Sequence, residues 1–112
     1  MSEQLPACVF CQIAAKQSPA TIRYEDDDVI AFDNRLTWVP VMVLVIPKRH
    51  MGQEELWASP IMSKIGAVAV ELGSQLCPGG YRMLSNVGRH AHQSQPHGHL
   101  HVLGGTDLGL YA

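Results

Sequence analysis

Three histidines near the C-terminal end of the chain, His97, His99 and His101, are separated from one another by single residues. If this segment is a β-strand, its side chains alternate between two faces, so the three imidazoles share one face and Leu100 and Val102 enter the other. A single histidine is often an ordinary surface or core residue, but three on one face indicate a shared metal, anion or substrate. We therefore expect this segment to carry the chemistry of the protein.

Two kinds of chemistry fit three clustered imidazoles. All three can ligate one metal ion, as the protein ligands of a zinc hydrolase do. Alternatively, the central imidazole can act as a nucleophile on a phosphate ester or phosphoramidate, because neutral imidazole attacks phosphorus well and also leaves it well. A neighbouring imidazole would then stabilise the oxygens of the transition state. The spacing of the histidines leaves both chemistries open.

The three cysteines of the chain are Cys8, Cys11 and Cys77. An odd number of cysteines, together with a polar N-terminus that lacks the pattern of an export signal, predicts a reducing, cytoplasmic setting rather than a disulfide framework. The C-x-x-C pair Cys8/Cys11 is compatible with half of a zinc site, a redox pair or chance, and the redox pair ranks lowest because no strand precedes it. Cys77 stands before Pro78 at the end of a helical pattern, where a small buried side chain is expected.

The composition indicates one globular domain over residues 1–112. Hydrophobic residues make up 46% of the 112 positions and charged residues 16%, which is enough apolar material for a core. The net charge of −2 offers no positive surface for a nucleic-acid backbone, so we expect no nucleic-acid partner. The longest apolar run, residues 41–46, is far too short to span a bilayer, so we expect no membrane partner either.

The elements that must position these residues follow from hydrophobic periodicity and from the placement of proline and glycine. A short helix is predicted over residues 9–16, and a long amphipathic helix follows Ser59 as its cap and Pro60 in its first turn, ending at Leu76. Strands are predicted over residues 21–25, 29–32, 41–46, 81–85 and 99–103. This order of elements predicts an α+β fold with a mainly antiparallel sheet.

The residues around the three histidines resemble a known family, the histidine triad (HIT) family. His97 to Leu103 is similar to its signature, in which three histidines alternate with other residues and a hydrophobic pair follows. Further similar segments occur in the family's order over residues 8–105: CVFCQI from Cys8, YEDD from Tyr24, AFD from Ala31, LVIPKRH from Leu44, GYR from Gly80, Asn86, QS from Gln93 and HVLGG from His101. Each segment is weak alone, but their joint order resembles the small nucleotide-binding, phosphoramidase-like branch.

The resemblance implies a fold, an activity and an assembly. The implied fold is HIT-like, with a five-stranded, mainly antiparallel sheet, a short N-terminal helix and one long helix. The implied activity is hydrolysis of purine nucleoside phosphoramidates or related nucleotide conjugates at the α-phosphate, through a nucleotidyl-histidine intermediate. The implied partners are a purine nucleoside monophosphate or its conjugates and a second copy of the chain, in a homodimer joined through the long helix and a neighbouring strand.

The resemblance also implies roles for single residues. His99 would be the nucleophile and His101 would contact the phosphate, so these two are the expected catalytic residues. Neutral donors would hold the phosphate oxygens and the leaving group, and an aspartate would accept hydrogen bonds from the ribose. These substrate-binding residues would be Asn86, Gln93, Ser94 and Asp33, with the base in an apolar slot formed by Val9, Phe10, Ile13 and Phe32. The alternative for the four slot residues is ordinary core packing.

Members of the family that contain zinc imply a further site formed by Cys8, Cys11, His50 and His97. Two thiolates and two imidazoles leave no open coordination position, so a zinc ion held there would be structural. The alternative is a reduced C-x-x-C pair that holds no metal. The zinc assignment takes the first histidine of the trio and leaves the other two for the substrate.

The chain departs from the family pattern at several positions. The family commonly has a histidine beside the nucleophile where this chain has Met42, which leaves a backbone carbonyl to orient the nucleophile. Gly98 replaces a hydrophobic residue and suggests a bulge or a close approach of the backbone to phosphate. Both departures favour the alternative of a nucleotide-binding module with little or no catalysis. The tail after Gly105 lacks a tryptophan that some relatives have, and His90 and His92 are expected in an exposed loop.

Overall fold

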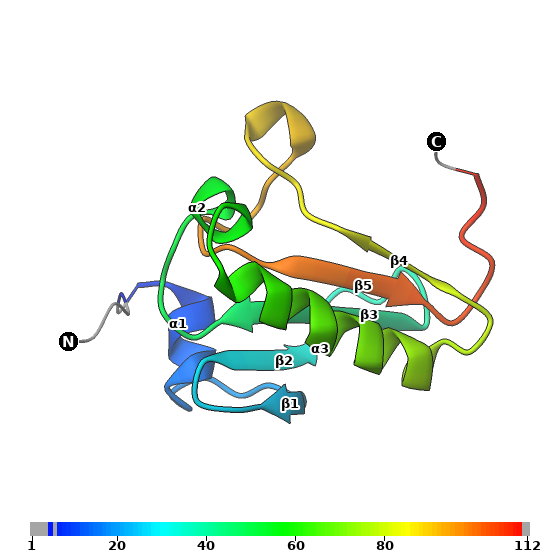
Figure 1. Cartoon of the computed structure of the whole chain (residues 1–112), viewed down its shortest axis with the longest axis horizontal. Coiled ribbons are helices and arrows are strands. Elements are labelled where there is room, and N and C mark those ends of the chain that lie inside the picture. The colour runs from blue at the N-terminus through cyan, green and yellow to red at the C-terminus, as the bar shows by residue number, and fades with distance from the viewer. Residues whose placement is uncertain (1–4, 6, 111–112) are drawn as a thin grey trace.

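A computed structural model describes residue 5 and residues 7–110 of the chain. Its elements occur in the order α1 (Val9–Ala14), β1 (Ile22–Glu25), β2 (Val29–Asp33), β3 (Val41–Pro47), α2 (Gln53–Trp57), α3 (Ile61–Leu76), β4 (Tyr81–Leu84), a 3₁₀ turn η1 (Arg89–Ala91) and β5 (Leu100–Gly104) (Figure 1). The α+β fold with a short N-terminal helix and one long helix is therefore confirmed.

The five strands form one antiparallel sheet in the order β1-β2-β3-β5-β4. The last strand, β5, is inserted between β3 and β4, so the strand that carries His101 has a partner on each side. In this register His101 lies opposite Leu44 of β3 and Leu84 of β4. Hydrogen bonds on both sides of a strand hold its side chains in fixed positions, as a binding or catalytic site requires.

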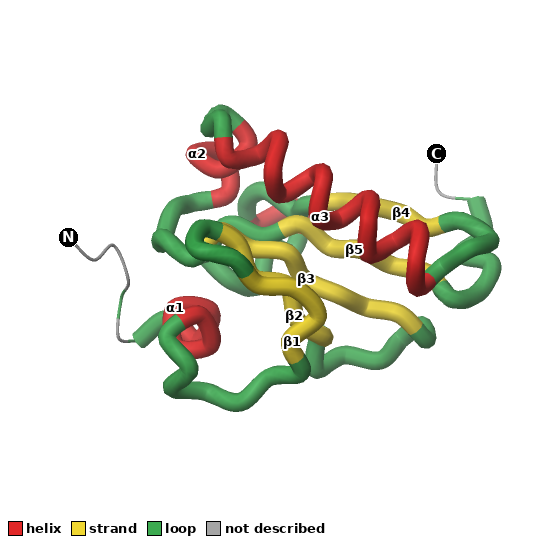
Figure 2. Tube along the Cα trace, turned by 60° about the horizontal axis from the view of Figure 1, so that its bottom comes forward, coloured by secondary structure: helices red, strands yellow, loops and turns green. Residues whose placement is uncertain are grey.

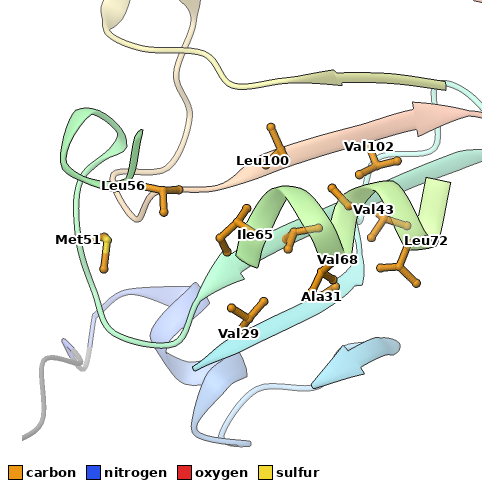
Figure 3. Packing of buried hydrophobic residues seen from close by; sticks show 12 residues of the cluster. Val29, Ala31, Val43, Met51, Leu56, Ile65, Val68, Leu72, Leu100 and Val102 are labelled. Carbon is orange, nitrogen blue, oxygen red and sulfur yellow. The ribbon is translucent and has the colours of Figure 1, made fainter. Parts of the chain in front are cut away.

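The two faces of the sheet bury different cores, and the alternation of β2 shows the division. Val29 and Ala31 face α3, in a cluster that includes Ile65 (Figure 3). Ile30 and Phe32 face the other way and pack with α1. In Figure 2 the long helix α3 runs along the sheet, whereas α1 lies apart from it near the N-terminal end.

The boundaries of the predicted elements are close to those observed, with three physical differences. Helix α1 ends at Ala14 rather than at residue 16, because the next turn closes through Lys16 in the left-handed region at φ 63°. Pro60 precedes α3 as its N-cap, and the Ser59 hydroxyl accepts a hydrogen bond from the Ile61 N–H at 3.3 Å. Helix α2 was not predicted, because a five-residue helix with one buried apolar side chain, Leu56, has no visible periodicity.

The other expectations for single residues concern cysteines and exposed histidines. Cys77 is a buried free cysteine, as expected, and Cys8 and Cys11 are also free and buried. His90 and His92 are exposed in the loop between β4 and β5, which projects from the molecule in Figure 1. Within the described residues no helix has the length and apolar character needed to cross a membrane.

Candidate active site and metal site

The sheet divides the residues of the histidine segment between its two faces, as the alternation predicts. Leu100 and Val102 are buried in the core beneath α3. The His99 ring packs edge-on against Phe10 of α1, with 5.3 Å between ring centroids, and against the His101 ring at 5.0 Å. Strand β5 begins at Leu100, one residue later than predicted, so His99 lies directly before the strand.

The protonation state of His99 follows from one contact. Its Nδ1 lies 2.7 Å from the backbone oxygen of His97. A carbonyl oxygen can only accept a hydrogen bond, so in the neutral ring Nδ1 carries the proton and Nε2 holds a free lone pair. Burial lowers the pKa of His99, and the hydrogen bond to His97 opposes this only in part. The ring is therefore a neutral imidazole at neutral pH, the form that a nucleophile needs.

The backbone of His99 is held as firmly as its ring. Its N–H donates to the Gln53 Oε1 at 2.7 Å, and its carbonyl oxygen accepts from the Ser85 hydroxyl at 2.6 Å. The Gln53 side chain is buried, and its amide nitrogen donates to the backbone oxygen of Asn86 at 3.1 Å. Sequence reasoning did not identify Gln53 or Ser85, because neither belongs to a motif and the contacts span 46 and 14 residues.

Gly98 lies against helix α2. A Cβ atom added there would lie 3.0 Å from the backbone oxygen of Gly52 and 3.0 Å from the Leu56 Cβ. The histidine segment and helix α2 therefore approach each other closely at this glycine. The Gly98 N–H also donates to the Met51 oxygen at 2.7 Å, so this contact joins two backbones directly.

His101 is a second neutral imidazole beside His99. Burial, together with the nearby His99, lowers the pKa of His101 to about 4. At neutral pH it therefore has one N–H to donate and one nitrogen that accepts. This arrangement fits recognition of phosphate oxygens by hydrogen bonds, in a chain that has no basic patch to attract them.

A cleft of about 460 Å³ opens over the two histidines. Its apolar wall is formed by side chains of α1, β2 and β3: Val9, Phe10, Ile13, Phe32 and Leu44. Its polar end contains His99, His101, Ser94 and Gln95. The predicted slot residues Phe10, Ile13 and Phe32 are buried members of the core around α1 and also line the cleft, so core packing and lining of the cleft are not exclusive.

Asp33 lies at the edge of the cleft, but its carboxylate has a partner. The Arg23 guanidinium donates to both oxygens, at 2.8 and 2.9 Å. Side chains along β2 point alternately to the two faces of the sheet, so Asp33 lies on the α3-facing side with Ala31. The next residue, Asn34, lies with Phe32 on the side of the cleft. Asn34 was not among the predicted residues and also lines the cleft.

Two of the predicted substrate-binding residues are not among those that line the cleft. Asn86 is half-buried, and its backbone oxygen bonds to Gln53 as described above. The Gln93 side chain folds back on its own loop, where Oε1 accepts from the Gly88 N–H at 2.9 Å and Nε2 donates to the Gln95 oxygen at 2.9 Å. Gln93 thus stabilises the loop that presents Ser94 and Gln95 to the cleft.

Four side chains from three segments form a cluster, and one of them is the first histidine of the trio. The donor atoms of Cys8, Cys11, His50 and His97 all lie within 4.8 Å of one another. The His97 Nδ1 is 3.4 and 3.5 Å from the sulfurs of Cys8 and Cys11, and the His50 Nδ1 is 3.4 Å from the Cys11 sulfur. Ligands at normal zinc distances on a tetrahedron are about 3.5 Å apart for a sulfur and a nitrogen, so the donor atoms fit a metal ion.

The hydrogen bonding of His97 also leaves a ring nitrogen of this cluster free to bind a metal. The His97 Nε2 lies 2.7 Å from the Pro47 carbonyl oxygen and must donate to it, which leaves the Nδ1 lone pair directed at the sulfurs. Burial raises the pKa of the Cys11 thiol, so a cation is needed to stabilise its thiolate. The buried Cys₂His₂ cluster could therefore hold a metal ion with no open coordination position.

The alternative of one metal held by all three trio histidines is not supported. In the described part of the chain, the group of His, Cys, Asp and Glu side chains close enough to share a metal contains His97 but neither His99 nor His101.

Met42 stands where the family commonly has a histidine, and a backbone carbonyl was expected to orient His99 in its place. Its sulfur accepts a hydrogen bond from the Trp38 N–H at 3.2 Å, and the His97 carbonyl orients the His99 ring.

Comparisons with known proteins agree with this geometry. A family model described as the HIT domain matches residues 15–108. The chain is 30% identical over 106 residues to the purine nucleoside phosphoramidase of Escherichia coli, covering 90% of this chain and 89% of the relative. A HIT family hydrolase from Clostridium thermocellum has a similar solved structure, with a TM-score of 0.89 at 36% identity over 96% of this chain and 98% of that one. A zinc-bound histidine triad family protein from Mycobacterium smegmatis has a TM-score of 0.70 at 28% identity over 92% and 80% of the two chains. The chain belongs to the histidine triad family.

Proposed function

We propose that this protein is a hydrolase that cleaves purine nucleoside phosphoramidates or related nucleotide conjugates at the α-phosphate. One observation carries the proposal: a neutral His99, with its Nδ1 proton fixed by the His97 carbonyl, lines an apolar cleft beside His101. The similarity to the phosphoramidase of Escherichia coli supports the same substrate class.

The reaction proceeds in two displacement steps. The Nε2 lone pair of His99 attacks phosphorus, a new N–P bond forms, and the P–N bond to the leaving amine breaks as the amine takes up a proton. The positive charge of the nucleotidyl-imidazole is stabilised by the Nδ1–H bond to the His97 oxygen. Water then attacks phosphorus, the bond to Nε2 breaks, and the nucleoside monophosphate leaves as the water proton passes to solvent.

The cleft has a chemical environment for each part of such a substrate. Purine rings are apolar on both faces, and the side chains of Phe10, Ile13 and Phe32 offer an apolar wall of matching character. His101 and Ser94 would donate to the phosphate oxygens, and Asn86, which does not line the cleft, would act through its hydrogen bond with Gln53. Gln93 would act by holding the loop that carries Ser94. Asp33 and the residue that follows it, Asn34, would bind the ribose at the end of β2.

We propose that the Cys8, Cys11, His50 and His97 cluster holds a structural zinc ion. The match between the donor distances and a tetrahedral site supports this, as does the zinc-bound relative from Mycobacterium smegmatis. The ion would tie the N-terminal segment to the end of β3 and to the histidine segment. It would supply no Lewis acid to the reaction, because all four positions are taken by protein ligands.

We also propose that two copies of the chain form a dimer through α3 and β4. Strand β4 is an edge strand of the sheet, and its Tyr81 ring packs on α3 at Gly73 while its hydroxyl donates to the Val70 oxygen at 3.4 Å. Met83 lies two residues along the same face of β4. Val70 and Met83 are 45% and 43% exposed, so α3 and β4 each present an apolar side chain to solvent.

The test is turnover of an adenosine 5′-phosphoramidate by the purified chain. We expect the wild type to release the monophosphate and His99→Ala to lose at least about 10³-fold in kcat. His90→Ala, which removes an exposed loop imidazole, is the matched control and should retain full activity. Equal rates for wild type and His99→Ala would refute the proposal, and tight monophosphate binding without turnover by the wild type would support a binding module instead.

A further inference from the structure

We propose that Gln53 is a positioning residue for the nucleophile, acting through the backbone of His99. This inference rests on the proposed function, since it concerns the residue assigned there to attack phosphorus. Gln53 is the first residue of helix α2 and lies 46 positions before His99. Nothing in the sequence marks it as functional, and no part of the mechanism above uses it.

The carboxamide of Gln53 has both of its ends occupied in a buried environment. Its oxygen accepts from the His99 N–H at 2.7 Å, and its nitrogen donates to the Asn86 oxygen at 3.1 Å. The side chain is only 3% exposed, so water cannot readily replace these bonds. A glutamine at this place therefore links the segment that enters β5 to the segment that leaves β4.

Helix α2 itself is fixed against the histidine segment. The Gly98 N–H donates to the Met51 oxygen at 2.7 Å, and the missing Cβ of Gly98 lets it contact the Gly52 oxygen and the Leu56 side chain. Gln53 thus reaches His99 from a support that is already packed against the neighbouring residue. A side chain that only filled space would not need two directed bonds from such a support.

The three hydrogen bonds of His99 act on one residue from three directions. Gln53 holds its N–H, Ser85 holds its carbonyl oxygen, and the His97 oxygen holds the ring at Nδ1. Loss of the Gln53 bond would leave a buried N–H unpaired, and the segment would shift to find another acceptor. Such a shift alters the distance and angle between Nε2 and the phosphorus, to which the rate of a displacement step is sensitive.

The test uses Gln53→Met, which has nearly the same length but neither a donor nor an acceptor of comparable strength. We expect kcat for an adenosine 5′-phosphoramidate to fall by about 10- to 100-fold, while KM and the Kd for adenosine monophosphate change by less than about 3-fold. Val68→Ala is the matched control, because it removes buried volume beneath α3 and leaves all three hydrogen bonds of His99 in place. It should lower thermal stability and leave kcat unchanged.

A second readout does not depend on activity. In nitrogen-15 NMR spectra we expect His99 of the wild type to be the Nδ1–H tautomer, and its backbone amide to exchange slowly with solvent. In Gln53→Met the amide should exchange faster and the tautomer signals should shift, whereas Val68→Ala should resemble the wild type. If Gln53→Met does not fold, Gln53→Asn serves in its place, because its side chain is one methylene too short to keep both bonds.

The two proposals fail in different ways. A wild type that does not hydrolyse the phosphoramidate overturns the proposed function, and the NMR measurement then still tests the role of Gln53. A folded Gln53→Met or Gln53→Asn variant with the kcat, His99 tautomer signals and His99 amide exchange of the wild type overturns the positioning role.

Discussion

His97 connects the Cys₂His₂ cluster, the proposed metal site, to His99, the proposed nucleophile, within a single residue. Its ring presents Nδ1 to the sulfurs of Cys8 and Cys11, while its backbone oxygen accepts the Nδ1–H of His99. Anything that fixes the His97 ring therefore also fixes the carbonyl that selects the tautomer of His99. At the scale of single residues, the first histidine of the trio would therefore contribute to the proposed reaction although it does not line the cleft.

Substitution of a cysteine in the cluster tests the zinc assignment. We expect the wild type purified with zinc to hold about one ion per chain, and Cys8→Ser to lose it, because serine is a poor zinc ligand. Chelation of the wild type should lower the free energy of unfolding by on the order of 2 kcal/mol or more. Metal analysis and denaturant unfolding are the measurements.

Two variants serve as controls for that experiment. Cys77→Ser removes a buried thiol far from the cluster, and His101→Ala removes an imidazole of the cleft; both should keep the ion. Loss of zinc from His101→Ala but not from Cys8→Ser would instead support a metal held by the trio.

Asp26 forms the acidic turn between β1 and β2. Its Oδ1 accepts from the N–H groups of Asp28 and Val29, and its Oδ2 accepts from the Tyr24 hydroxyl at 2.6 Å and lies 3.0 Å from the Lys64 Nζ. Burial opposes ionisation of Asp26, but these hydrogen bonds outweigh it and hold the pKa of Asp26 well below its usual range. The carboxylate therefore stabilises the folded chain.

The direction of this pKa change predicts how stability depends on pH. Because the pKa of Asp26 is lower in the folded chain than the value of about 3.9 in the unfolded chain, its stabilisation is complete above about pH 5 and is lost as the pH falls below about 4. We expect Asp26→Asn to lower the free energy of unfolding by about 1 kcal/mol at pH 7, and the difference to shrink below pH 4. Urea unfolding across this pH range is the measurement.

An exposed neighbour provides the control for the Asp26 variant. Asp27→Asn changes the net charge by the same amount at the next position of the turn. An equal effect of both substitutions at every pH would mean that net charge, rather than the hydrogen bonds of Asp26, sets the stability.

At the scale of elements, the contact between α2 and the histidine segment requires a glycine. Gly98→Ala would bring a Cβ to 3.0 Å from the Gly52 backbone oxygen, and a backbone atom cannot move aside without shifting α2. We expect a loss of about 1–3 kcal/mol in the free energy of unfolding and a fall in kcat, because the shift reaches His99. Thermal denaturation and turnover measure the two effects.

The matched control is Gly66→Ala in α3. A Cβ at Gly66 has no neighbouring atom within 4 Å, so alanine there should stabilise the helix by about 0.5–1 kcal/mol and leave kcat unchanged. A Gly98→Ala variant as stable and as active as the wild type would show that the docking of α2 is not tight.

The sequence predicted the elements with strong local patterns and missed those that depend on tertiary contacts. The apolar, β-branched runs of β2 and β3 and the periodicity of α3 place these elements within one or two residues. Helix α2 has no such pattern, and Gln53, the positioning residue proposed above, is recognisable only by contacts with residues far along the chain. Asp33 shows the same limit, since its pairing with Arg23 depends on the register of two strands.

The metal cluster was predictable for another reason. Cys8 and Cys11 form a visible pair, but the two histidines that complete the set were assigned by resemblance and not by spacing. The sheet brings His50 and His97 to the cysteines, because His50 follows β3 and His97 precedes the antiparallel neighbour β5 at the same end of the sheet. Roles that depend on such long-range contacts cannot be read from one sequence without knowledge of the fold.

At the scale of the whole molecule, the larger apolar core and the proposed site lie on opposite faces of the sheet. The α3 face is covered by the larger apolar cluster, shown in Figure 3, whereas the opposite face holds α1, the cleft and the metal cluster. The outer edge of β4 and the adjoining part of α3 remain exposed. Residues of β2, β3 and β5 line the cleft, and no residue of β4 does.

A charge on the exposed apolar surface tests the proposed dimer. We expect Met83→Asp to shift the chain from dimer to monomer in analytical ultracentrifugation, because a buried unpaired charge is costly at an apolar interface. Ile22→Asp, at an exposed apolar position on the opposite edge strand, should remain a dimer. A wild type that sediments as a monomer at all concentrations would contradict the dimer itself.

The measurement that tests the central claim most directly is the capture of the covalent intermediate. Wild-type chain mixed with an adenosine 5′-phosphoramidate and quenched rapidly in alkaline denaturant should carry one adenylyl group. Intact mass spectrometry would detect the group, and peptide mapping should place it on His99, with none on the His99→Ala chain. Turnover with no adenylylated wild-type chain at any time, or an adenylyl group equally present on the His99→Ala chain, would contradict the assignment of His99 as the nucleophile.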